Sequence, residues 1–225
     1  MIPWQLLDSA PVPGGAQIMR LYRRGGEFSI RVDGNELMNS RVHGSEDVLA
    51  ELTCAGLVNR PAARILIGGL GMGYTLAAAL QNLGDQARVV VAELVPAVVG
   101  WNRGVLAGLA GHPMDDVRVA VRESDVGLLI KKEEQGFDAI ILDVDNGPEG
   151  LTRSGNDRLY SKAGLAAAHG ALAPGGILAV WSASADSAFS RLLRQAGFTV
   201  REIAARARGR KGGSRHMIWL AQRGQ

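Results

Sequence analysis

The stretch "RILIGGLGMGYTLAAAL", residues 64–80, decides the fold of this chain. It begins as a short apolar run of the kind that forms a buried strand, and it ends as a helical pattern rich in alanine and leucine. Between the two lie four glycines within six positions, Gly68, Gly69, Gly71 and Gly73. Glycines at such a place either allow a tight strand-to-helix corner or let a ligand approach the backbone closely. The stretch alone leaves both possibilities open.

Downstream of this corner, strand and helix patterns alternate to the end of the chain. The expected strands are nearly continuous apolar runs, which is typical of a parallel sheet covered by helices on both faces. The last two, near residues 198–206 and 215–223, are joined by a loop too short for a crossover helix, so we expect them to be antiparallel. The predicted fold class is therefore α/β, with a Rossmann-like, mostly parallel seven-stranded sheet whose last strand is antiparallel.

Upstream of the corner, residues 1–60 have a different pattern. The runs "QIMRLYRR" and "EFSIRVDG" are short and extended, and Asp33-Gly34 tolerates the positive φ that a tight hairpin turn requires. A helix is expected over "SEDVLAELTCAGLV", with Ser45 as its N-cap and acidic residues in its first turn. We therefore divide the chain into an N-terminal β-hairpin region with a leading helix, residues 1–60, and a Rossmann-like domain, residues 61–225.

Composition is that of a soluble globular protein, with 47% hydrophobic and 21% charged residues. Cys54 is the single cysteine, so no disulfide can form within the chain, and a reducing compartment is expected. The N-terminal "MIPWQLLDSAPVPGG" lacks the basic and apolar segments of a signal peptide, and no run is long enough to span a membrane. We expect a cytoplasmic protein. The four histidines are scattered without ligand spacing, so no metal site is expected.

The basic residues are concentrated in one segment. The net charge is +3, and "RARGRKGGSRH" at residues 206–216 carries five arginines and lysines. This segment joins the last two strands, so it emerges at the edge of the sheet where such folds bind ligands. The simplest interpretation is a solvated loop; the alternatives are a rim that contacts an anionic substrate, a nucleic acid or a neighbouring subunit. Nucleic-acid binding is the less favoured of these.

Carboxylates follow the expected strands at that same edge. Glu93 ends the strand after the glycine corner, twenty positions beyond Gly73, and an acid at this spacing typically accepts hydrogen bonds from ribose hydroxyls. Asp125 follows the third strand, where it either meets an adenine edge or caps the next helix. Asp143 and Asp145 follow the fourth strand, before a Gly-Pro loop that could close over a substrate; the alternative is an acidic solvated turn.

At this point the chain resembles a known family. Five segments look like the successive motifs of class I S-adenosylmethionine-dependent methyltransferases and, among these, of the spermidine synthases, which are polyamine aminopropyltransferases: "ILIGGLGMGYTL", "VVVAELVPAVV", "RVAVRESD", "FDAIILDVDNGPEG" and "LYSKAGLAAAHGALAPGGILAVWS". The N-terminal hairpin and the "SEDVLAEL" helix also resemble that family's small β-domain and the helix that follows it. The resemblance covers nearly the whole chain.

The resemblance implies a role for each matching residue on the nucleoside side. Gly69, Gly71 and Gly73 would cradle the amino-acid end of the ligand, Glu93 would hold the ribose, and Asp125 the adenine amino group. The implied donor is decarboxylated S-adenosylmethionine or S-adenosylmethionine itself, used as a co-substrate without a metal.

On the acceptor side, the resemblance makes Asp143 the acid that takes the amine proton. We expect Asp145, one step before the position of the family's second aspartate, to be a second catalytic carboxylate. Glu46 and Asp47 match positions where the family carries a His and a Glu in its polyamine pocket, and Tyr160 matches an aromatic position. The chain departs from the family in two places: the glycine loop lacks its usual acid, and Asn146 replaces the second loop aspartate.

Three functions follow as hypotheses. The first is aminopropyl transfer from decarboxylated S-adenosylmethionine to an amine such as putrescine, by a protein that forms homodimers, as the resembled family usually does. The second is methyl transfer from S-adenosylmethionine to another substrate, which the missing loop acid favours. The third is nucleoside binding without catalysis, for instance in a nucleic-acid-associated protein that uses its basic segment.

Overall fold

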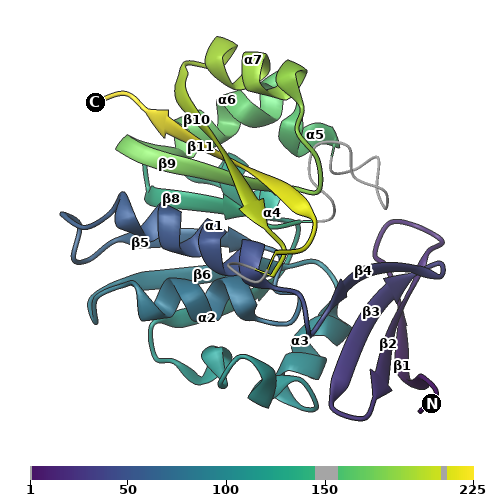
Figure 1. Cartoon of the computed structure of the whole chain (residues 1–225). Helices are drawn as coiled ribbons and strands as arrows, with labels where there is room; N and C mark the ends of the chain where they lie inside the picture. Colours follow the sequence, from purple (N-terminus) through teal and green to yellow (C-terminus); the bar gives the residue numbers. More distant parts are fainter. Residues whose placement is uncertain (1, 145–156, 209–211) are drawn as a thin grey trace.

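The computed structural model describes residues 2–144, 157–208 and 212–225, and within these ranges the chain forms two sheets (Figure 1). The larger sheet has seven strands in the order β10-β11-β9-β8-β5-β6-β7. Only β11 runs against its neighbours, pairing antiparallel with both β9 and β10. This confirms the predicted mostly parallel sheet with a reversed last strand. Its strands are β5 (Arg64–Gly68), β6 (Arg88–Glu93), β7 (Val119–Glu123), β8 (Phe137–Leu142), β9 (Leu172–Ser182), β10 (Phe198–Arg206) and β11 (Arg215–Arg223).

Helices cover both faces of this sheet because successive strand residues point to opposite sides. In β5, Ile65 and Ile67 join one buried apolar cluster, and Leu66 joins the other. The first cluster is completed by helices α1, α2 and α3, and the second by α4, α6 and α7. The helices are α1 (Gly44–Ala55), α2 (Tyr74–Gln81), α3 (Pro96–Arg103), α4 (Val126–Lys132), α5 (Asp157–Tyr160), α6 (Lys162–Ala171) and α7 (Ser187–Gln195), with short 3-10 turns at Ala107–Leu109 and Pro113–Asp115.

The smaller sheet is N-terminal and consists of four antiparallel strands in chain order: β1 (Gln5–Pro11), β2 (Ile18–Arg24), β3 (Glu27–Val32) and β4 (Asn35–Asn39). The predicted hairpin is present, since Asp33 and Gly34 adopt φ of 49° and 87° between β3 and β4. The sequence analysis missed β1, so the region is a full sheet rather than a hairpin. This strand is mostly exposed and is interrupted by a register shift between Leu6 and Asp8, which removes the alternating pattern that identifies a strand.

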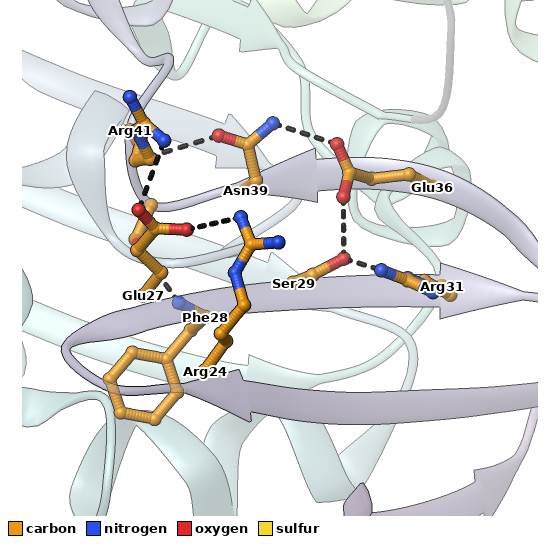
Figure 2. A network of polar contacts seen from close by, with 9 residues as sticks. Arg24, Glu27, Phe28, Ser29, Arg31, Glu36, Asn39 and Arg41 are labelled. Atoms are coloured by element: carbon orange, nitrogen blue, oxygen red, sulfur yellow. Dashed lines mark hydrogen bonds and ion pairs between the residues drawn. The ribbon is translucent and has the colours of Figure 1, made fainter. Parts of the chain in front are cut away.

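A polar network fastens one face of the small sheet (Figure 2). Glu27 accepts hydrogen bonds from Arg24 at 2.8 Å and from Arg41 at 3.0 Å, and these partners lower the pKa of its carboxyl, Arg24 contributing most. Two residues further along β3, Ser29 donates a hydrogen bond to Glu36 on β4 at 2.7 Å, which links these two strands. The network holds together a sheet whose other face supplies a wall of the cavity described below.

Helix α1 joins the two sheets, and its start differs from the expectation. The predicted N-cap at Ser45 is wrong: the helix begins at Gly44, His43 occupies the N-cap position, and no side chain caps it. The Gly44 N–H donates to the carbonyl of Ala207, the residue that follows β10, at 2.9 Å, and this contact fixes where the helix begins. Ser45 is thereby completely buried inside the first turn. Helix α1 packs beside α2 on the larger sheet, and the boundary between residues 60 and 61 stays a prediction.

No helix in the described ranges is long and apolar enough to cross a membrane.

Candidate active site

The glycine corner between β5 and α2 is built by backbone conformations that other residues rarely adopt. Gly69, Gly71 and Gly73 have φ of 88°, 53° and 85°. A Cβ atom on Gly69 would lie 2.3 Å from the carbonyl oxygen of Asp143, and one on Gly71 would lie 2.8 Å from the sulfur of Met38. Gly73 is the N-cap of α2. The corner therefore needs its glycines for its own geometry, and Gly69 and Gly71 also line a cavity.

This cavity, of about 180 Å³, lies between the small sheet and the carboxyl edge of the large sheet. The small sheet and the segment that follows β1 supply an apolar wall of Val12, Met19, Ile30, Leu37 and Met38. Four carboxylates line the other side: Glu46, Glu93, Asp125 and Asp143. Among the described lining residues there is no lysine, arginine or histidine. The cavity is thus suited to a ligand that combines an apolar part with positive charge.

Glu93 lies buried at the end of β6, beneath the glycine corner. One carboxylate oxygen accepts a hydrogen bond from the N–H of Leu70 at 2.9 Å, and the other from the N–H of Val95 at 2.8 Å. Burial raises the pKa of Glu93, and these backbone donors oppose that rise. Glu93 therefore ties the corner to the next loop while it lines the cavity, and its role toward a ribose stays a prediction.

Asp125 caps a helix, which is one of the two roles expected for it from the sequence. It is the N-cap of α4, and its Oδ1 accepts a hydrogen bond from the N–H of Gly127 at 2.8 Å. Because it also lines the cavity, a contact with an adenine edge is compatible with capping and stays a prediction.

Asp143 follows β8 and faces Glu46 from α1 across the cavity. Its Oδ2 accepts a hydrogen bond from the Thr75 hydroxyl at 2.5 Å. Burial raises the pKa of Asp143, and the Thr75 bond opposes the rise. Burial also raises the pKa of Glu46, and the charge of Asp143 raises it further. A buried carboxylate of raised pKa can accept a proton near neutral pH, and a pair of ionised carboxylates attracts a cation.

Three other predicted site residues lie elsewhere. Asp145 falls in residues 145–156, outside the described part of the chain. Asp47 does not line the cavity directly: its carboxylate pairs with Nδ1 of His43 at 2.9 Å, and the His43 ring stacks on Tyr74, which does line it. Tyr160 is buried against Phe189, edge to face at 5.6 Å, in the core on the opposite face of the sheet. Of the basic segment, residues 209–211 also lie outside the described ranges.

Two polar residues connected to Glu46 were not predicted as part of the site, Ser45 and His216. The Ser45 hydroxyl donates to Glu46 Oε2 at 2.6 Å, and its oxygen lies 2.8 Å from Nδ1 of His216, 171 residues away along the chain. The edge of the His216 ring contacts Trp181, a cavity-lining residue whose buried indole N–H has no hydrogen-bond partner in the described structure. A signal existed: because the last strand is reversed, its first residues must lie at the ligand-binding edge.

Comparisons with known proteins agree with this architecture. No protein-family model matches the chain. Polyamine aminopropyltransferases of Mycobacterium tuberculosis and Mycobacterium bovis are 30% identical to it over 187 residues, a match that covers 79% of this chain and 34% of each relative. The chain thus spans about a third of the length of these curated relatives.

Solved structures give a broader match in fold. The spermidine synthase of Thermotoga maritima superposes with a TM-score of 0.76 at 18% identity, covering 97% of this chain and 73% of that one. A probable spermidine synthase from Corynebacterium glutamicum has a TM-score of 0.66 at 17% identity, covering 97% and 79%.

The reversed last strand, the glycine corner and the acids at the carboxyl edge define a Rossmann-like fold of the class I methyltransferase type. Within that class the chain is related, in sequence and in fold, to the polyamine aminopropyltransferase or spermidine synthase family. The resemblance seen in its motifs is confirmed at this level.

Proposed function

We propose that this protein is an aminopropyltransferase, which transfers the aminopropyl group of decarboxylated S-adenosylmethionine to a small amine. The observation that carries the proposal is the charge of the cavity. Four carboxylates line it, and no basic side chain is found among its described lining residues. Both the donor, with its sulfonium and ammonium groups, and a protonated amine are cations, so this cavity is electrostatically matched to the two reactants together.

The same charge distribution favours the decarboxylated donor over S-adenosylmethionine. A carboxylate on the ligand would meet like charges, and two unit charges about 4 Å apart interact by roughly 4 kcal/mol at an effective dielectric constant of 20. The glycine corner does not offset this fully, because the N–H of Leu70 already donates to Glu93. A donor that ends in an ammonium group meets no such repulsion.

The chemistry requires a neutral amine. An alkyl ammonium has a pKa near 10.4, so only about one molecule in a thousand is neutral at pH 7. In this proposal Asp143, which faces Glu46 across the cavity, accepts the amine proton. The amine nitrogen then attacks the carbon next to the sulfonium, the C–S bond breaks, its electron pair stays on sulfur, and methylthioadenosine leaves. The enzyme orients the two reactants and excludes water around an already activated carbon.

The remaining assignments are part of this proposal. Glu93 holds the ribose and Asp125 the adenine amino group, above a corner formed by Gly69, Gly71 and Gly73. On the acceptor side Glu46 binds an ammonium group directly and Asp145 is a second catalytic carboxylate. Asp47 acts through His43 and Tyr74, and Tyr160 contributes only by packing, from the core on the other face of the sheet. A homodimer is proposed from the family resemblance, and a cytoplasmic location from the single cysteine, Cys54. Nucleic-acid binding through residues 206–216 is the disfavoured alternative.

One observation favours methyl transfer as a second candidate. The corner carries no acid to hold an aminopropyl ammonium, and the sulfur of Met38 occupies the space next to Gly71, where a side chain on that residue would extend. This surface is neutral rather than acidic. It would accept the methionine part of S-adenosylmethionine with less repulsion than the rest of the cavity.

The identity of the nucleoside product decides between these functions. The protein is incubated separately with decarboxylated S-adenosylmethionine and with S-adenosylmethionine, each with a panel of mono-, di- and triamines. We expect methylthioadenosine, formed only when the decarboxylated donor and an amine are both present, and far less of it with Asp143→Asn. S-adenosylhomocysteine as the sole product would establish methyl transfer instead, and the absence of both products would favour a binding protein.

A further inference from the structure

The buried serine at the start of α1 connects two parts of the molecule that are remote in sequence. Ser45 has no exposed surface, so its hydroxyl must find its partners within the protein. It donates to Glu46 Oε2 at 2.6 Å, and because its single proton is used there, its oxygen can only accept from Nδ1 of His216 at 2.8 Å. The arrangement is a directed chain, from an imidazole N–H to a hydroxyl and from the hydroxyl to a carboxylate.

We infer that His216, acting through Ser45, is a positioning residue that keeps Glu46 oriented and ionised as the ammonium-binding carboxylate of the acceptor site. The inference rests on the proposed function for the nature of the acceptor. It assigns a role to the last strand, β11, in substrate binding.

The surroundings of His216 support a fixed donor. Its ring is packed edge-on against Trp181, with centroids 4.7 Å apart, and burial lowers its pKa. A neutral imidazole has one N–H, and the bond to Ser45 selects the tautomer that carries it on Nδ1. Protonation would leave the Nδ1–H donor in place, so the direction of the chain does not depend on the charge of His216.

The surroundings of Glu46 explain why it needs such support. Burial and the charge of Asp143 disfavour its ionised form, and the hydrogen bond from Ser45 is the side-chain contact that favours it. The titratable and charged groups on the elements around Glu46 and His216 are Asp143 after β8, Asp47 and His43 at the start of α1, Tyr74 on α2, and the exposed Arg206 and Arg215 on β10 and β11. Without the hydrogen bond from Ser45, Glu46 would lose a contact that stabilises its ionised form, while the charge of Asp143 still disfavours that form.

Three variants test the inference. His216→Phe keeps a ring against Trp181 but lacks the donor, His216→Asn keeps an N–H donor near the same place, and Ser45→Ala removes the link. His169→Phe is the matched control, because His169 is also partly buried and packs edge to face with Phe198 at 5.0 Å. It lies at the end of α6, before β9 begins, and so at the edge of the sheet opposite to the cavity.

The first measurement is steady-state kinetics from pH 6 to 9 with the acceptor amine varied. For His216→Phe and Ser45→Ala we expect the amine KM to rise about 5- to 20-fold at pH 7, while affinity for methylthioadenosine changes less than twofold. The acid limb of kcat/KM should move to higher pH, because Ser45→Ala removes the bond that stabilises the charged form of Glu46. In His216→Phe that bond remains, but it comes from a hydroxyl that His216 no longer orients. His216→Asn should recover most of the loss. Equal profiles for His216→Phe and His169→Phe would overturn the inference.

The second measurement does not depend on turnover. The carboxyl resonance of Glu46 is assigned by carbon-13 NMR through its absence in Glu46→Gln, and its titration is followed in each variant. We expect its midpoint to rise in His216→Phe and Ser45→Ala and to stay unchanged in His169→Phe; an unmoved midpoint would overturn the inference even in an active enzyme. A raised midpoint in a protein that transfers no aminopropyl group would overturn the proposed function while confirming the link to Glu46.

Discussion

The carboxylate of Glu93 accepts hydrogen bonds from the backbone and also lines the cavity. It satisfies the N–H groups of Leu70 and Val95, and it faces the cavity in which we propose that the nucleoside binds. A carboxylate has about four acceptor sites, so two backbone donors leave room for ribose hydroxyls. In this proposal the same residue shapes the corner and contacts the ligand, and a glutamate suits the end of β6 better than a shorter or neutral residue.

Replacement of Glu93 tests the nucleoside site. We expect Glu93→Ala to weaken binding of methylthioadenosine about 10- to 100-fold, because hydrogen bonds to a charged acceptor contribute roughly 1.5–3 kcal/mol. Isothermal titration calorimetry measures the change. Glu123→Ala is the control, since Glu123 pairs with Glu93 in the sheet register but is exposed and does not line the cavity. Equal affinity in the two variants would refute the assignment.

Replacement of Asp143 tests the proton acceptor. Asp143→Asn keeps the shape of the side chain and an acceptor for the Thr75 hydroxyl, but it removes the base. We expect kcat to fall by about two to four orders of magnitude, with nucleoside affinity nearly unchanged. Asp145→Asn is measured in parallel. Activity that survives in Asp143→Asn and is lost in Asp145→Asn would show that the proton acceptor is the second aspartate.

At the level of elements, the corner between β5 and α2 is held by the strand on its other side. The N–H of Asp143 donates to the carbonyl of Gly68 at 3.0 Å, which brings the end of β8 against Gly69. The carbonyl oxygen of Asp143 then occupies the space that a side chain on Gly69 would need. Close packing of two parallel strands, and not the ligand alone, therefore requires glycine at this position.

Alanine substitutions separate this packing from backbone strain. Gly111→Ala introduces a side chain at φ 76° with no atom within 4 Å of the new Cβ, and we expect it to lower the free energy of unfolding by roughly 1–2 kcal/mol. Gly69→Ala adds a contact of 2.3 Å with a backbone oxygen. We expect a loss of about 4 kcal/mol or more, in the exceptional range for one substitution. Urea denaturation measures both, and equal losses would contradict the close approach of β8.

For the whole molecule, the opposed carboxyl groups link stability to pH. A carboxyl group whose pKa is higher in the folded than in the unfolded chain binds more protons when folded, so stability falls as pH rises through the interval between the two values. The pKa values of Glu46 and Asp143 are both raised by burial. Their ionisation therefore lowers the free energy of unfolding above neutral pH. Binding sites are often less stable than the rest of a protein for reasons of this kind.

Removal of the Glu46 charge should restore the stability that is lost at high pH. We expect Glu46→Gln to raise the free energy of unfolding by roughly 1–3 kcal/mol at pH 8 and to have little effect near pH 3, where the carboxyl group is protonated in both states. Thermal or urea unfolding across this pH range measures the effect. Glu51→Gln, at an exposed site on the same helix, is the control and should show no such pH dependence. A constant difference between Glu46→Gln and the parent protein would contradict the opposition of charges.

Much of this architecture was determined by the sequence itself. The alternation of apolar strands and helices, the glycine corner and the short last connection predict the seven-stranded sheet and its reversed strand, because they depend on local periodicity and chain length. The acids Glu93, Asp125 and Asp143 follow from the rule that parallel strands end at one edge, and the structure places all three around the cavity. The irregular edge strand β1 left no such periodic signal.

Only the tertiary structure decided which remote residues meet. Ser45 was expected as a helix cap, but the contact between Gly44 and Ala207 starts the helix earlier and turns the serine toward Glu46 and His216. Tyr160 was expected near the substrate, yet it packs in the core on the other face of the sheet. The position of Ser45 depends on how α1 docks against β10 and β11, through contacts made across more than 150 residues. The position of Tyr160 depends on which face of the sheet its helix covers. No local pattern in the sequence records either outcome.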